Sequence, residues 1–138
     1  MKVLVLLILS FFLFGSFFVV DYKEIPVEIY KEKSDFNNIQ INDSIIYYFS
    51  EGFDSKVIVK FKDSVLLENE VLSNSNWANK SLVIHLDKMK YSDEIIVFIP
   101  SKGVKFTCVI DKMYKYVHLY LYPNFCINTH VNSKTISE

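Results

Sequence analysis

The residues best suited to recognition in this chain of 138 residues form an aromatic row near its end. Tyr114, Tyr116, His118, Tyr120 and Tyr122 occupy every second position, and alternate residues of an extended strand share one face. Tyrosine combines apolar area with a polar hydroxyl, so such a face can bind a protein, a peptide or a glycan. The alternative is purely structural, because tyrosine is a good strand former and aromatic pairs stabilise exposed sheet faces.

The only tryptophan, Trp77, is a second candidate for contact with a partner. It lies in an asparagine-rich stretch, residues 73–80, that we expect to be a loop. An aromatic ring on a protruding loop is a frequent contact element. The alternative is that Trp77 folds back over the edge of the domain.

Cys108 and Cys126 are the two cysteines of the chain, and their pairing is left open by the sequence. A pair outside the cytoplasm permits a disulfide. Cys108 also fits a buried thiol, since alternation places it on one face with Val104, Phe106 and Ile110.

Motifs for catalysis, metal binding and cofactor binding are absent from the sequence. The three histidines, His85, His118 and His130, lack the spacing of a metal site, and we expect His85 to be a solvated strand position. There is no Gly-x-Ser-x-Gly elbow and no loop that could cradle phosphate. We therefore expect no enzyme, no metal and no cofactor.

The charge of the chain argues against nucleic acid as a partner. All 15 basic residues are lysine, the formal net charge is −1, and the lysines are scattered. Without arginine the chain lacks the planar fork that suits phosphate recognition. Basic patches are the usual footprint of nucleic-acid binding, and we expect none here.

The elements that would position these residues are strands. Short segments rich in Val, Ile, Phe and Tyr alternate with turn residues about every ten positions, which predicts an all-β antiparallel sandwich. The expected strands are 25–31, 45–49, 57–61, 65–72, 82–86, 95–99, 104–110 and 114–122. We expect segment 95–99, apolar throughout, to lie in the middle of a sheet, and the turn Pro100-Ser101-Lys102-Gly103 to join it to 104–110 as a hairpin. Pro123 should end the last strand.

Three parts follow from this pattern: a hydrophobic segment at 1–20, a sandwich domain at 21–127, and a loose polar tail at 128–138. The first segment has a basic Lys2 and then an apolar run, which is typical of an export or membrane-insertion signal. As a helix the run would be about 27 Å long, close to the thickness of a bilayer core. We expect an uncleaved anchor with the domain outside the cytoplasm; the alternative is a cleaved signal and a periplasmic or secreted protein.

The order of segments 57–65 (VIVKFKDSV), 82–84 (LVI) and 95–97 (IIV), closed by an aromatic strand, resembles small exported bacterial β-sandwich proteins. These have immunoglobulin-like or transthyretin-like (carboxypeptidase regulatory-like) domains, and the resemblance covers residues 39–122. It implies a binding or structural module and supplies no catalytic residues. The sequence therefore predicts a non-enzymatic membrane-anchored module. One alternative is a secreted effector or inhibitor, and the other is a small hydrolase or sugar-active enzyme.

Overall fold

The computed structural model describes residues 21–33, 42–72, 81–90 and 92–132. The predicted N-terminal helix at 1–20, Trp77 and the end of the predicted tail lie outside these residues. In the part of the chain that the structure describes, no helix is long and apolar enough to cross a membrane.

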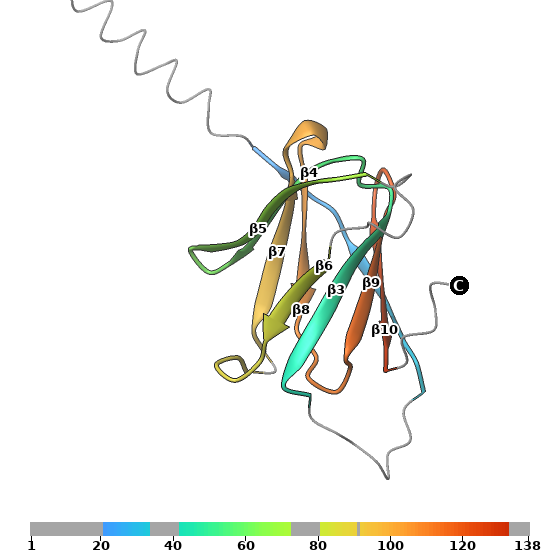
Figure 1. The fold of residues 1–138 in the computed structure, drawn as a ribbon. Coiled ribbons are helices and arrows are strands. Elements are labelled where there is room, and N and C mark those ends of the chain that lie inside the picture. The colour runs from blue at the N-terminus through green and yellow to red at the C-terminus, as the bar shows by residue number, and fades with distance from the viewer. Residues whose placement is uncertain (1–20, 34–41, 73–80, 91, 133–138) are drawn as a thin grey trace, which may run out of the picture.

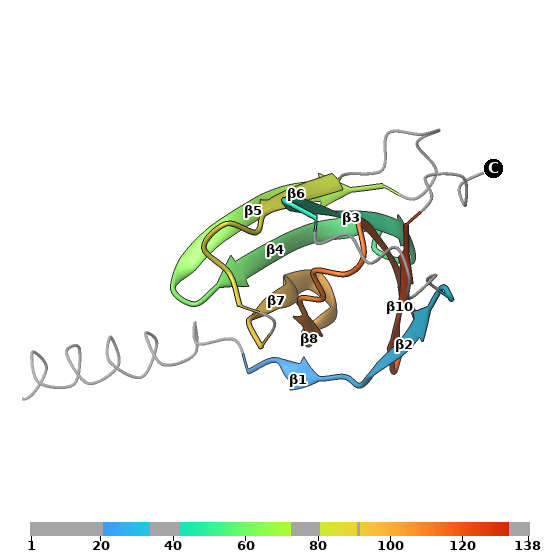
Figure 2. The ribbon, with the colours of Figure 1, turned by 90° about the horizontal axis from the view of Figure 1, so that it is seen from below.

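Two sheets of five strands pack face to face as a β-sandwich (Figures 1 and 2). Sheet A has the order β1-β8-β7-β4-β5, and sheet B has the order β2-β10-β9-β3-β6. In sheet A the strands are β1 (Lys23–Glu24), β8 (Val104–Val109), β7 (Glu94–Ile99), β4 (Ser55–Phe61) and β5 (Ser64–Val71). In sheet B they are β2 (Val27–Lys31), β10 (Cys126–Val131), β9 (Tyr116–Leu121), β3 (Ser44–Glu51) and β6 (Ser81–His85). The all-β sandwich predicted from the sequence is confirmed.

The expectation of purely antiparallel sheets is wrong. Strand β3 runs parallel to β9 inside sheet B, and the N-terminal strands β1 and β2 run parallel to β8 and β10. A period of two identifies strands but carries no information about the direction of a neighbouring strand. The N-terminal stretch contributes to both sheets, because the chain passes from β1 to β2 through the buried Ile25 and the exposed Pro26.

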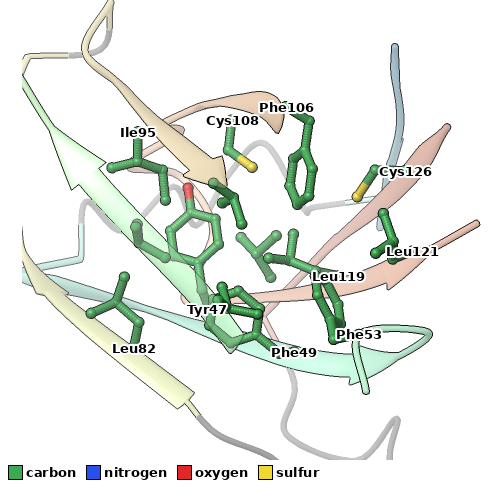
Figure 3. Close-up of a cluster of buried hydrophobic side chains, with 14 of the residues drawn as sticks. Tyr47, Phe49, Phe53, Leu82, Ile95, Phe106, Cys108, Leu119, Leu121 and Cys126 are labelled. Atoms are coloured by element: carbon green, nitrogen blue, oxygen red, sulfur yellow. The ribbon is translucent and has the colours of Figure 1, made fainter. Parts of the chain in front are cut away.

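The core between the sheets consists of the alternate residues that the sequence places inward (Figure 3). Val57 and Val59 are fully buried, and so are Ile95, Val97 and Ile99 of β7. Leu82, Ile84 and Leu86 are also buried, whereas His85 is exposed as expected. Strand β7 lies between β8 and β4, which confirms its predicted position in the middle of a sheet.

The predicted hairpin from β7 to β8 is present. Residues Pro100–Lys102 form a short 3-10 helix, and Gly103 follows with φ of 62°. The Gly103 N–H donates to the Pro100 carbonyl over 3.1 Å. Proline fixes the start of this turn and glycine accepts the left-handed end, as their types suggested.

Strand β10 differs from the sequence prediction, which began a loose tail at residue 128. The strand continues to Val131, antiparallel to β9 and parallel to β2, so both of its edges are paired. Its inward residues Asn128 and His130 are each 1% exposed. The sequence concealed this strand because polar residues occupy inward positions where apolar ones are usual.

Candidate functional site

Three members of the predicted aromatic row lie together on the outer face of sheet B. Tyr116, His118 and Tyr120 point outward from β9, while Val117 and Leu119 on the other side are fully buried. Strand β9 lies between β10 and β3 in the middle of the sheet. The predicted alternation along this strand is therefore confirmed over Tyr116–Leu121.

Tyr48 of β3 joins this row and was not found from the sequence. The parallel register pairs Tyr48 with His118, and their rings stack with centroids 5.0 Å apart at 17°. Tyr48 also stacks on Tyr116 at 6.2 Å and 26°. His118 Nδ1 lies 3.3 Å from the Ser50 hydroxyl oxygen, and burial lowers the pKa of His118. His118 is only 6% exposed, so its ring mainly packs against the neighbouring rings and has little contact with solvent.

Strand β10 completes the surface on the other side of β9. The register places Thr129 beside His118 and Ile127 beside Tyr120. We call the outward side chains of these three strands the tyrosine face: Ile46, Tyr48, Ser50, Tyr116, His118, Tyr120, Ile127 and Thr129. At its border, Tyr30 of β2 is 55% exposed and lies in register with Thr129.

Tyr114, at one end of the predicted row, does not belong to this face. Tyr114 precedes β9 in a turn closed by Asp111, is 7% exposed, and donates its hydroxyl hydrogen to the Glu32 carbonyl over 2.9 Å. Because the chain is not extended there, alternation does not carry Tyr114 onto the outer face. Its inclusion as a contact residue was wrong, since its ring is part of the packing.

Tyr122 lies just beyond β9 in the turn to β10 and is 41% exposed. Its ring stacks on Phe125 with centroids 4.7 Å apart at 9°. Tyr122 also lines a shallow hollow of about 520 Å³ at this end of the sandwich, together with Gly52, Asp54, Lys102, Val104, Leu121 and Pro123. The ring is accessible, but one of its faces is occupied by Phe125.

Both cysteines are free, buried thiols in the core, and the disulfide alternative is not realised (Figure 3). Asn128 lies between them: its amide donates to Cys108 Sγ over 3.3 Å, and Cys126 Sγ donates to its carbonyl oxygen over 3.5 Å. Burial raises the pKa of Cys108 to about 12 and that of Cys126 further. Both thiols therefore stay protonated at neutral pH, and a protonated thiol is a poor nucleophile.

His130 is the one buried histidine whose ring nitrogens both lack a hydrogen-bond partner among the described residues. Burial, with the nearby Lys31 ammonium, lowers the pKa of His130 to about 4, and Asp111 opposes the shift. The ring forms a T-shaped contact with Tyr114, with centroids 5.6 Å apart at 76°. His130 is therefore neutral at physiological pH and occupies the interior, away from the tyrosine face.

Among the described residues, no three His, Cys, Asp or Glu side chains come together in a way that could hold a metal ion. Comparison with known proteins finds no matching family model, no matching curated protein and no matching solved structure. The tyrosine face is the best-defined surface feature of the described residues.

Proposed function

We propose that this chain is a non-enzymatic binding module whose tyrosine face contacts another protein. The observation that carries the proposal is the composition of the face. Aromatic, aliphatic and hydroxyl side chains fill the centre of sheet B, and charged side chains lie at its border: Glu51 in register with Tyr120, and Lys115 hydrogen-bonded to Ser44. Protein interfaces are enriched in tyrosine and depleted of charge at their centres.

The outer face of sheet A provides an internal comparison. Lys56 and Lys60 of β4, Glu94 of β7 and Lys105 of β8 point outward there. Lys56 also forms an ion pair with Glu68 of the neighbouring strand at 2.8 Å. A sheet face with such charges is typical of a surface in contact with water. The outer face of sheet B, with fewer charges, is therefore the better candidate for a binding surface.

The stacking within the tyrosine face favours a protein partner over a glycan. Sugars bind aromatic side chains by lying flat on an exposed ring face, whereas Tyr48 stacks on both His118 and Tyr116. The ring edge and hydroxyl of Tyr48 remain for contact, and these match the mixed apolar and polar surface of another protein.

The finer fold assignment is also part of the proposal. Immunoglobulin domains consist of antiparallel sheets. The parallel pairing of β3 with β9 in the middle of sheet B favours the transthyretin-like alternative. We further propose that the domain lies outside the cytoplasm, held at the membrane by the hydrophobic segment at 1–20; this part rests on the sequence alone.

Site-directed photocrosslinking in cells that make the full chain tests the binding role. A benzophenone amino acid replaces Tyr120 in one variant and Phe98 in the other. Both are half-buried aromatic residues that point outward from central strands, Tyr120 in β9 and Phe98 in β7. We expect a discrete protein adduct from position 120 and none from position 98. Absence of an adduct at 120, or equal adducts at both positions, would contradict the proposal.

A further inference from the structure

We infer that the protein bound by the tyrosine face is a second copy of this chain, so that two such faces stack in a dimer with twofold symmetry. This inference rests on the proposed function and identifies its partner. In a twofold interface the same surface patch serves on both subunits, so the patch must complement itself. The composition of the tyrosine face meets that requirement in hydrogen bonding, in charge and in area.

Hydrogen bonding is self-complementary on this face. The polar groups that the face offers to a partner are the hydroxyls of Tyr48, Tyr116, Tyr120 and Thr129. A hydroxyl is both donor and acceptor. Two copies of such a surface can pair with each other, whereas a row of lysines or carboxylates cannot.

Charge also permits two tyrosine faces to meet. The nearest carboxylates in the described part of the chain are Glu28 of β2 and Glu51 at the end of β3, and both lie at the border of the face. The outer face of sheet A instead carries Lys60, Lys105 and Glu94, and burying such charges in a contact costs desolvation energy. The charge pattern therefore selects sheet B for self-association.

The area is sufficient for a specific contact. The three strands of the tyrosine face project to about 290 Å², and with the bordering strands β2 and β6 the outer face of sheet B measures roughly 24 by 20 Å, or about 480 Å². Side chains raise the accessible area above its projection, so two whole outer faces of sheet B would bury about 1,000 Å² in total, the threshold for a biological interface. Stacked sheets pack about 10 Å apart at an angle of about 30°, a geometry that twisted sheets adopt readily.

Sedimentation equilibrium of the full chain, in a detergent matched to the solvent density, measures this association. The two test variants are Thr129→Lys in the tyrosine face and Thr107→Lys on the outer face of sheet A. Both threonines are half-buried and point outward from paired strands, β10 and β8, so the substitutions are matched. We expect a dimer for the wild-type chain. Thr129→Lys should raise the dissociation constant at least about tenfold, because it places two like charges in the interface, while Thr107→Lys should leave it unchanged.

A wild-type chain that remains monomeric at about 100 μM would overturn the inference, since a specific dimer should form at that concentration. Equal effects of the two lysine substitutions would overturn it as well. Thermal melting of both variants separates loss of association from loss of folding. If the chain is monomeric but Tyr120 crosslinks to a different protein, the inference fails while the binding function stands. If neither association nor crosslinking occurs, both fail.

Discussion

Lowering the pH from 6.5 to 4 should destabilise this domain, and His130 should account for most of the effect. The side chain is 1% exposed, and neither ring nitrogen has a partner among the described residues. An imidazolium in this position would lose its hydration and would face the Lys31 ammonium, and only the Asp111 carboxylate opposes this cost. These effects lower the pKa of His130 from 6.5 to about 4.

The sign of the effect follows from proton binding. Between pH 6.5 and about 4 the unfolded chain carries a proton on His130 that the folded chain does not, so stability falls as the pH falls. Each unit of pKa difference corresponds to about 1.4 kcal/mol, so the total loss is about 3 kcal/mol. His118 adds to the loss, because burial also lowers its pKa. The pKa of Asp111 is lowered too, but its stabilising contribution is lost only as the pH falls through and below the ordinary carboxyl range.

Urea unfolding at a series of pH values, followed by near-ultraviolet circular dichroism, measures this dependence. We expect the wild-type free energy of unfolding to fall steadily from pH 6.5 to 4. The variant His130→Leu should lose most of that slope, because leucine fills the site without titrating. His85→Gln is the control, since His85 is exposed on β6, and it should keep the wild-type slope. A slope in His130→Leu as steep as that of the wild-type chain would refute the assignment.

Other changes test the remaining features of the structure. Gly52→Ala should lower the free energy of unfolding by several kcal/mol, because the new Cβ would lie 1.9 Å from the Leu121 carbonyl oxygen. Gly103→Ala should lower it by only about 1 kcal/mol, because its φ of 62° is the sole obstacle. Thermal unfolding of both variants measures the difference. The thiols of Cys108 and Cys126 should react with iodoacetamide only after denaturation, which mass spectrometry measures. If the denatured protein reacts only once a reductant is added, the two cysteines form a disulfide. The double variant Tyr116→Ser, Tyr120→Ser should lose about 1–2 kcal/mol, well below the cost of two core aromatics, in urea unfolding. An uncleaved N-terminal segment predicts an intact mass in the membrane fraction, and a loss of about 2 kDa would show cleavage.

The inward-facing residues of the sandwich could be predicted from the sequence because apolar residues alternate strictly in most strands. The buried positions of β6 and β7 follow from that period, and the hairpin at Pro100 and Gly103 follows from turn chemistry. Strand β10 could not be predicted in the same way. Its inward positions hold Asn128 and His130, and Asn128 is accommodated only because two thiols from different sheets approach it.

The candidate site illustrates a second limit, which concerns pairing between strands distant in sequence. The tyrosine row on β9 is visible in the sequence, yet Tyr48 becomes part of it only because β3 runs parallel to β9 in register with His118. A parallel pair needs a long crossover, and here the intervening chain passes twice through sheet A, returning to sheet B in between as β6. The contact surface is therefore a product of topology: β9 supplies one row of rings, and the parallel neighbour supplies the ring that stacks on two of them. A substitution at Tyr48 should consequently disturb Tyr116 and His118 together, although Tyr48 is 68 and 70 residues from them in the sequence.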